Sequence, residues 1–320
     1  MKNKNGVMSV NAIIEKITEQ IQEGIYPGAS LALYRKGQWS EHYLGLADPE
    51  KGEPVEANLV YDLASVSKVV GVATICAFLY AKGELPIDRP FKELYPRFAH
   101  EKTTIRELLT HTSGLDPFIP NRDQLDARQL KIALENLQIK KDKSFHYTDV
   151  NFLLLGFWLE DRFHQPLDRL FEELIFTPWK MTETRFGPVE KAVPTVRGVA
   201  SGSVHDPKAR VLGPHAGSAG LFSTVADLER FLEHYLKDDF ARDLSQNFAR
   251  EEGKTRALGW NLEGDWLDHT GYTGTFIMYN RKRQEAVIFL SNRTYEKDER
   301  AQWILDRNSL MDLIKQEFEK

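Results

Sequence analysis

The chain has 320 residues, of which 42% are hydrophobic and 28% charged, and its 42 Lys and Arg against 47 Asp and Glu give a formal net charge of −5. These proportions are typical of a globular protein and exclude a disordered, collagen-like or coiled-coil chain. The chain has no long run of Lys and Arg, which argues against nucleic acid or an anionic membrane as the main partner, because both require a basic surface. A small molecule is the expected partner.

The N-terminus and the single cysteine bear on the compartment. Met1–Val10 carries positive charge but lacks the apolar stretch of roughly 7–15 residues that an export signal places behind it, so we expect a cytoplasmic protein from the chain as given. One cysteine, Cys76, excludes an internal disulfide and a cysteine-based zinc site. It lies in the apolar stretch Val69–Ala81, which is shorter than the roughly 18–20 residues that span a bilayer. We therefore expect a buried helix with an inert thiol.

The first predicted elements are a helix, a β-hairpin and an enclosed helix. Apolar residues recur every three or four positions over residues 9–24 and predict an amphipathic helix that ends at Pro27-Gly28. The period changes to two over residues 29–46, which predicts two strands joined by a tight turn at Arg35-Lys36-Gly37-Gln38. From Ser65 to Leu79 the helical pattern is apolar all round, as in a helix surrounded by protein.

The middle of the chain, residues 85–205, is predicted to be mainly helical, and strands return only towards the end. The expected helices lie at 104–110, 127–137, 150–161, 166–174, 224–237 and near 301–318, and the expected strands at 256–263, 274–280 and 285–291. Strands at both ends with helices between them predict an α/β (α+β) fold. Its antiparallel sheet combines N- and C-terminal segments, is flanked by helices and is interrupted by a mainly α-helical insertion.

This pattern predicts two structural parts with the active site in the cleft between them. Residues 1–84 and 206–320 are expected to form the α/β sheet domain, and residues 85–205 the mainly helical domain.

The sharpest local motif is Ser65-Val-Ser-Lys68 at the start of the apolar helix, where a spacing of three places Ser65 and Lys68 on one helical face. A serine hydroxyl is a poor nucleophile until an amine takes or relays its proton, and a partly buried lysine has a lowered pKa suited to this task. The N-terminus of the helix adds backbone N–H groups that can bind an oxyanion. The alternative is that Ser65 caps the helix and Lys68 is a solvated surface charge.

Two further segments could carry chemistry. Tyr147-Thr-Asp149 precedes the predicted helix at 150–161, and a tyrosine of lowered pKa beside a lysine can act as a general base. Alternatively, Tyr147 packs in the core and Asp149 caps the helix. His269-Thr-Gly-Tyr-Thr-Gly-Thr275 is expected to open a C-terminal strand whose small residues let a substrate approach the backbone. The alternative for this segment is a glycine-rich turn between strands.

In chain order, the motifs S-x-x-K, Tyr-x-Asp and His-Thr-Gly resemble those of the penicillin-recognising serine hydrolases. The chain looks most like the class C β-lactamase and esterase branch, because the second motif begins with tyrosine. Thr104–Leu115, Tyr147–Gly156 and Ala219–Leu228 also resemble that branch, so the resemblance runs from about residue 10 to residue 318.

The resemblance implies a β-lactamase/transpeptidase-like fold and an acyl-enzyme mechanism that needs no metal or cofactor. Ser65 would attack a carbonyl, Lys68 and Tyr147 would handle the proton, and water would release the acyl group. The backbone N–H groups of Ser65 and Tyr272 would form the oxyanion hole.

The chain departs from the family pattern at two of the residues expected to bind substrate, which are Asp149, His269, Thr270, Gly271 and Tyr272. In the family that it resembles, a lysine that recognises a substrate carboxylate stands at the position of His269, and imidazole is only fractionally charged near pH 7. Asp149 stands in place of an asparagine, and a carboxylate cannot donate to a substrate's amide carbonyl. Both changes favour a small ester or amide without a required carboxylate.

Several alternatives remain beside this interpretation. One is a D,D-carboxypeptidase or β-lactamase acting on D-Ala-D-Ala-like peptides or β-lactams, although such peptides lie outside the cytoplasm. Another is a non-catalytic binding protein on the same fold. Ala216–Gly220 nearly matches a nucleophile elbow around Ser218 but lacks its first glycine and a parallel βαβ pattern.

The histidines and aromatic residues give weaker indications. His111, His205 and His215 are scattered without a metal-ligand spacing, so hydrogen bonding in loops or the core is expected for them. Aromatic residues near the motifs are candidates for an acyl pocket, although each is more typical of a core. These residues are Phe118, Phe145, Tyr272 and Phe276.

Overall fold

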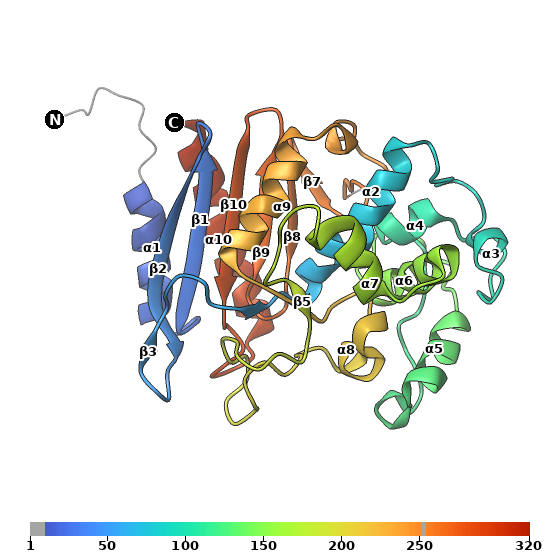
Figure 1. The fold of residues 1–320 in the computed structure, drawn as a ribbon, viewed down its shortest axis with the longest axis horizontal. Helices are drawn as coiled ribbons and strands as arrows, with labels where there is room; N and C mark the ends of the chain where they lie inside the picture. Colours follow the sequence, from blue (N-terminus) through green and yellow to red (C-terminus); the bar gives the residue numbers. More distant parts are fainter. Residues whose placement is uncertain (1–9, 251–253) are drawn as a thin grey trace.

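A seven-stranded antiparallel sheet forms one side of the molecule in the computed structural model, which describes residues 10–250 and 254–320 (Figure 1). Its strand order is β3-β2-β1-β10-β9-β8-β7, so the N-terminal strands pair directly with the C-terminal ones. The strands are β1 Gly28–Arg35, β2 Gln38–Asp48, β3 Glu53–Pro54, β7 Asn261–Glu263, β8 Trp266–Thr270, β9 Phe276–Asn280 and β10 Glu285–Ser291. The predicted α/β fold with one sheet from both ends of the chain is confirmed.

Helices cover both faces of the sheet, which explains why β1 is buried along nearly its whole length. Helices α1 (Val10–Gln22) and α10 (Arg300–Glu319) pack on the face that carries Leu31 and Leu33. Helix α9 (Val225–Lys237) packs on the opposite face, which carries Ala32, and crosses in front of the sheet in Figure 1. The alternation follows from the two-residue period of a strand. The predicted first helix, hairpin and closing helix are confirmed.

The middle of the chain forms the helices beside the sheet, as predicted (Figure 1). They are α3 Phe91–Leu94, α4 Ile105–Thr110, α5 Ala127–Glu135, α6 Val150–Phe163, α7 Leu167–Phe171 and α8 Pro207–Leu212, and a π-helical turn, Glu172–Phe176, follows α7. Helices α4 and α5 each begin with a capping box. The division into two domains stays a prediction.

Two strand predictions were wrong in detail, and a small sheet was missed. A small sheet, in the order β4-β6-β5, joins Tyr61–Asp62, Leu221–Ser223 and Arg185–Phe186, and it was not predicted because such short strands show no period. The strand expected at 256–263 is reduced to β7. His269 does not open a strand, because it lies near the end of β8 and residues 271–275 form the turn to β9.

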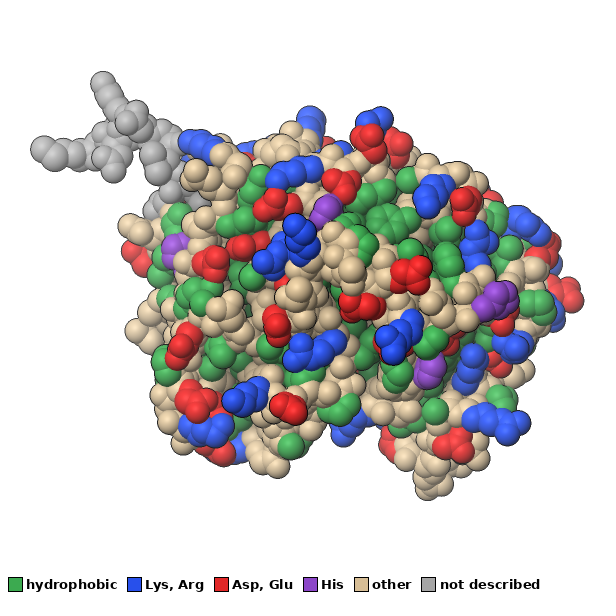
Figure 2. Space-filling view, viewed as in Figure 1, with side chains coloured by type: hydrophobic (Ala, Val, Ile, Leu, Met, Phe, Trp, Pro, Cys, Tyr) green, Lys and Arg blue, Asp and Glu red, His purple; other side chains and the backbone are tan. Residues whose placement is uncertain are grey.

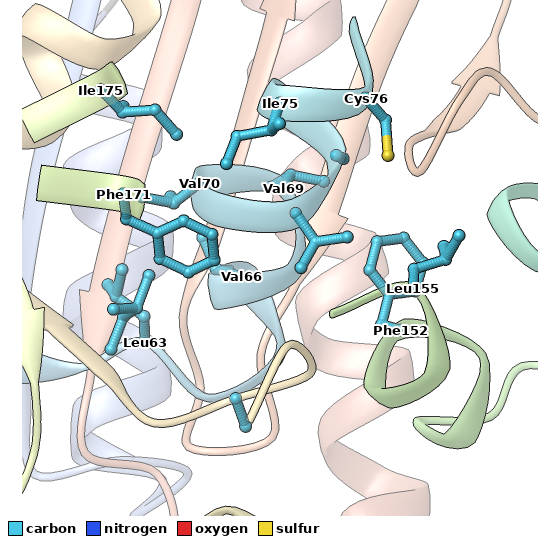
Figure 3. Packing of buried hydrophobic residues seen from close by; sticks show 14 of the residues in the cluster. Leu63, Val66, Val69, Val70, Ile75, Cys76, Phe152, Leu155, Phe171 and Ile175 are labelled. Carbon is cyan, nitrogen blue, oxygen red and sulfur yellow. The ribbon is translucent and has the colours of Figure 1, made fainter. Parts of the chain in front are cut away.

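The apolar helix lies between the sheet and the helical part. A 3₁₀ turn (Ala64–Val66), a π-helical turn (Val69–Ala73) and α2 (Thr74–Ala81) follow one another along it. The stretch Ala64–Ala81 is longer than Val69–Ala81 and has the length and composition of a membrane span. However, 78% of it is buried inside the protein, as in a core helix. Figure 3 shows its valines between Phe171 and Phe152.

Two further sequence predictions concern Cys76 and the N-terminal segment. Cys76 is fully buried, and burial raises the pKa of its thiol to about 12, consistent with an inert residue. The N-terminal segment that was assessed for an export signal lies, up to Ser9, outside the described residues. On the face drawn in Figure 2, acidic and basic side chains are interspersed.

Candidate active site

A strained turn places Ser65 at the start of the buried helix. The Asp62 carboxylate accepts the backbone N–H of Ala64 and that of His205, each at 2.8 Å, and so fixes the chain as it leaves β4. Burial raises the pKa of Asp62 to about 6. Ala64 has φ 46°, a left-handed conformation that costs a non-glycine residue roughly 1–2 kcal/mol. The turn leaves Ser65 partly exposed at the N-terminal end of the helix.

Lys68 lies beneath Ser65 with no exposed side-chain surface. Its Nζ donates to Ser65 Oγ at 2.9 Å, to Asp149 Oδ1 at 2.7 Å and to the backbone carbonyl of Ser218 at 2.9 Å. An ammonium group has three N–H donors, so all three are used. The geometry therefore holds Lys68 as a cation whose charge is directed at the serine oxygen.

The pKa of Lys68 is raised, so the predicted lowering was wrong. Burial lowers the pKa of this amine, but the Asp149 carboxylate more than offsets that effect. A local motif does not reveal this partner, because it lies 81 positions away in the sequence. The alternative of a solvated surface lysine was also wrong. In this state Lys68 donates a hydrogen bond to Ser65 and is not the acceptor of its proton.

Asp149 binds two lysines instead of capping its helix. It occupies the N-cap position of α6, but its side chain makes no capping hydrogen bond. The second lysine, Lys208 of α8, lies 3.3 Å from Asp149 Oδ2 with 15% of its side chain exposed. Burial alone would raise the pKa of Asp149, but the two ammonium groups hold it at about 2. The capping interpretation of Asp149 was wrong, and sequence reasoning missed Lys208.

The Tyr147 side chain lies next to Lys68, whose Nζ is 5.2 Å from the centre of the phenol ring. The tyrosine hydroxyl is buried, and no residue within 10–250 or 254–320 gives it a hydrogen bond. Two imidazoles flank the ring, His111 at 4.6 Å and His269 at 6.1 Å between ring centres. Tyr147 is thus adjacent to the Lys68 that holds Ser65, with an oxygen free to exchange a proton.

His269 is a neutral hydrogen-bond acceptor at the end of β8. Its Nδ1 lies 3.1 Å from the carbonyl of Thr270, which can only accept, so Nδ1 carries the proton and Nε2 presents a lone pair. Burial lowers the pKa of His269 well below its usual value, and the charges of Lys68 and Arg256 lower it further. The position at which the family it resembles has a lysine therefore holds no positive charge near pH 7.

The turn after His269 is fixed against the segment that precedes Ser65. Thr273 Oγ1 donates to the Asp62 carbonyl at 2.9 Å, and Thr275 Oγ1 donates to the Leu63 carbonyl at 3.0 Å. A Cβ at Gly271 would lie 2.6 Å from the same Leu63 oxygen, so only glycine fits there.

This contact brings the two expected oxyanion donors towards the same place. No described residue accepts a backbone hydrogen bond from Ser65 or from Tyr272, so both N–H groups are free. Thr270 ends β8 beside them, and the Tyr272 hydroxyl donates to Asp298. Lys68 therefore contacts Ser65 directly, Asp149 and Tyr147 lie beside Lys68, and the turn after His269 packs against the segment that leads to Ser65.

Other sequence candidates lie elsewhere or play another part. Ser218 is fully buried and contributes its backbone carbonyl to Lys68, not a nucleophilic hydroxyl. Phe276 is buried against Phe289 in the core on the sheet's far face, so it lines no pocket. Phe118 is 74% exposed. No group of three or more possible His, Cys, Asp or Glu metal ligands occurs in the part of the chain that the structure describes.

Sequence reasoning missed two groups beside the motifs. His111 was noted only as a scattered histidine, although it lies in Thr104–Leu115, a segment quoted for the resemblance. Arg256 is fully buried, its guanidinium stacks 5.3 Å from the Phe145 ring, and none of the described carboxylates forms a salt bridge with it. Its Nη1 donates to Asn261 Oδ1, its Nη2 donates to the Gly259 carbonyl, and its Nε has no described partner. Burial lowers the pKa of Arg256 to about 10, so it remains a cation.

Comparisons with known proteins show what this chain is similar to. A family model described as Beta-lactamase matches residues 13–310. A protein named putative D-alanyl-D-alanine carboxypeptidase from Escherichia coli K12 is 27% identical over 363 residues, covering 90% of this chain and 83% of the relative. Two solved structures share the fold over 94% of this chain. One is a β-lactamase/D-alanine carboxypeptidase from Pseudomonas syringae, with TM-score 0.73, 19% identity and 98% of that chain covered. The other is EstCE1, a hydrolase with promiscuous acyltransferase activity, with TM-score 0.74, 18% identity and 97% covered.

Proposed function

The chain belongs to the beta-lactamase family of penicillin-recognising serine hydrolases, and from that premise we propose that it cleaves small esters or amides through an acyl-enzyme on Ser65. The observation that carries the proposal is the 2.9 Å hydrogen bond from the fully buried Lys68 to the partly exposed Ser65 hydroxyl. A buried ammonium directed at an accessible serine oxygen has no structural need to be there, because a buried charge is costly. It stabilises negative charge on that oxygen as the serine loses its proton.

Acylation in this site uses Tyr147 as the proton carrier. Ser65 Oγ forms a bond to the substrate carbonyl carbon while its proton passes to the Tyr147 oxygen, and the tyrosine's own proton passes to the leaving alcohol or amine. The carbonyl oxygen becomes an oxyanion held by the free N–H groups of Ser65 and Tyr272. Water then attacks the acyl carbon while its proton passes to the Tyr147 oxygen. The bond between Ser65 Oγ and the acyl carbon breaks, the proton of Tyr147 passes to Ser65 Oγ, and the carboxylic acid leaves.

The charges around the site favour a substrate without a carboxylate. His269 is neutral, and Asp149 is already bound by two lysines. An ionised Asp149 accepts hydrogen bonds only, so it offers no donor to an amide carbonyl. A short acyl ester or a simple amide needs neither contact.

A second candidate is a D,D-carboxypeptidase, which Arg256 favours. Its guanidinium is a buried cation without a carboxylate partner, and it acts on His269 electrostatically. A buried unpaired charge is costly, and a peptide carboxylate that reached it would relieve the cost. The name of the Escherichia coli relative points the same way.

The first test measures hydrolysis of p-nitrophenyl acetate and butyrate by the wild type, Ser65→Ala and Ser245→Ala. Ser245 is an exposed serine and serves as the matched control. We expect Ser65→Ala to lose turnover by about 10³-fold or more and to show no acyl adduct by intact mass, while Ser245→Ala behaves as the wild type. Turnover or an adduct that survives in Ser65→Ala contradicts the proposal.

Penicillin and a peptide ending in D-Ala-D-Ala separate the alternatives. An esterase hydrolyses the esters and leaves the peptide intact, whereas a D,D-carboxypeptidase releases D-alanine and is acylated stably by penicillin. In the second case Arg256→Met raises KM for the peptide and leaves KM for the ester unchanged. A non-catalytic binding protein on this fold gives neither turnover nor adduct.

A further inference from the structure

We propose that His111 is a positioning residue for Tyr147, held as a single neutral tautomer by Asn151 and Ser113; this rests on the proposed function, in which Tyr147 carries the proton. His111 follows α4 with φ 58° and ψ 38°, a left-handed conformation that costs a histidine free energy. Its carbonyl accepts the backbone N–H of His146 at 2.9 Å, which ties this turn to the segment that leads to Tyr147. Such strain persists where the surroundings fix it, and it is common at functional sites.

A chain of hydrogen bonds determines which nitrogen of His111 carries the proton. The Ser113 hydroxyl donates to Asn151 Oδ1 at 2.7 Å, so the amide nitrogen of Asn151 faces His111. That nitrogen lies 3.0 Å from His111 Nδ1 and can only donate, and the Thr148 backbone N–H approaches the same Nδ1 at 3.4 Å. Nδ1 therefore carries the lone pair and Nε2 carries the hydrogen.

The imidazole fixed in this way packs against the catalytic phenol. The ring centres of His111 and Tyr147 are 4.6 Å apart with the planes tilted by 39°. His111 also contacts Phe152 of α6 at 5.5 Å, so its ring is held from both sides. A phenol that carries a proton between serine and leaving group needs a fixed orientation, and the packing of His111 against Tyr147 supplies it.

The charges that face His111 keep it neutral. They are Lys68 from the buried helix and Lys254 and Arg256 from the segment before β7, and the titratable group beside them is His269 of β8, which is itself neutral. Burial lowers the pKa of His111 well below its usual value, and these groups lower it further. His111 thus presents an uncharged face to Tyr147 throughout the range in which a free histidine titrates.

Nitrogen-15 NMR of histidine-labelled wild-type protein tests the tautomer without any substitution. We expect His111 to carry its proton on Nε2 and not to titrate from about pH 5 to about pH 9. His234 is a matched internal reference, because it also stacks on an aromatic ring, Trp179, but is partly exposed. A proton on His111 Nδ1, or titration of His111 in this range, overturns the proposal.

Single-turnover acylation by p-nitrophenyl acetate tests the effect on Tyr147. His111→Gln is expected to slow acylation by about 10-fold to 100-fold with little change in KM, because the Tyr147 phenol loses the imidazole that packs against it. Asn151→Asp keeps the shape but draws a proton to Nδ1, so it should add an ionisation to the pH profile. His234→Gln should leave both unchanged.

The outcomes separate this inference from the proposed function. Folding is checked by circular dichroism and thermal unfolding, and Asn151→Asp remains informative if His111→Gln does not fold. Folded variants that acylate at the wild-type rate with an unchanged pH profile overturn the role of His111. A wild type that forms no acyl adduct overturns the proposed function, while the NMR result still decides the tautomer.

Discussion

The two sides of the site around Ser65 differ in whether their polar atoms have partners. On the charged side, formed by Lys68, Asp149 and Lys208, every N–H of the buried lysine has an acceptor, and the carboxylate has two cations. On the aromatic side, the Tyr147 hydroxyl and the Nε2 atoms of His111 and His269 are buried without partners among the described residues.

This difference separates the groups that fix the charge at Ser65 from the groups that take part in the reaction. Groups whose hydrogen bonds are complete fix the charge at Ser65 before any substrate arrives, which is the preorganisation that electrostatic catalysis needs. Groups with unused donors and acceptors are desolvated without a hydrogen bond in the free protein, which is unfavourable. A substrate or a proton that binds to them removes this free-energy cost. Substitutions on the charged side should therefore change stability and activity together, and those on the aromatic side should change activity alone.

Lys68→Met should have the largest effect, because it removes the centre of the charged side. We expect esterase activity to fall by about 10⁴-fold, since Ser65 loses the cation that stabilises its oxygen. The free energy of unfolding should fall by about 3 kcal/mol, since Asp149 keeps Lys208 but loses its buried partner. Ester turnover and urea unfolding measure the two effects.

Lys208→Met is the matched control for Lys68→Met, because Lys208 binds the same Asp149 carboxylate without contacting Ser65. It should cost about 1 kcal/mol or less and change activity by less than about tenfold. Equal losses of activity in the two variants would mean that the charge of the cluster, and not the contact with Ser65, supports catalysis.

Tyr147→Phe should break the aromatic side and leave stability unchanged. Removing the hydroxyl takes away the proton carrier, so activity should fall by about 10²-fold to 10⁴-fold. The same change removes a buried polar atom that has no described partner, so the free energy of unfolding should stay equal or rise slightly.

Tyr279→Phe provides the control, because the Tyr279 hydroxyl is likewise buried without a described partner but lies in the sheet. It should match Tyr147→Phe in thermal unfolding while keeping full activity. If Tyr147→Phe destabilises the protein as much as Lys68→Met does, the contrast between the two sides is wrong.

The sequence predicted the two sides unequally, for a physical reason. The serine and lysine are neighbours on one helix turn, so a spacing of three was sufficient to pair them. The pKa of Lys68 was predicted wrongly, because it is raised by the Asp149 carboxylate, which only the folded chain brings near. The pKa of a side chain depends on such distant partners, and periodicity carries no information about them.

The fold shows the same limit. Long periodic elements such as α1, the β1–β2 hairpin and α10 were predicted, because their burial repeats along the chain. The strand pairing of β4, β6 and β5 was not, since each has only two or three residues. The segment from His269 was expected to open a strand, but residues 271–275 form the alternative, a glycine-rich turn between strands. Thr273 and Thr275 donate from this turn to the carbonyls before Ser65.

Asp149→Asn tests the charged side through its pH dependence. The pKa of Asp149 lies at about 2 in the folded protein against an ordinary value of 3.8, so its ionised form stabilises the fold. That contribution is complete above the ordinary value and is lost as pH falls towards 2. At pH 7 the variant should lose about 2 kcal/mol of unfolding free energy.

The difference between Asp149→Asn and the wild type should therefore close between about pH 4 and about pH 2, as measured by urea unfolding across that range. Asp88→Asn is the control, since Asp88 pairs with Arg106 and Arg250 but is 46% exposed and should contribute less than about 1 kcal/mol. The amide at position 149 can donate a hydrogen bond, so amide or β-lactam acylation should rise relative to ester turnover. A gap in stability that stays constant down to pH 2 would show that shape, and not charge, links Asp149 to the two lysines.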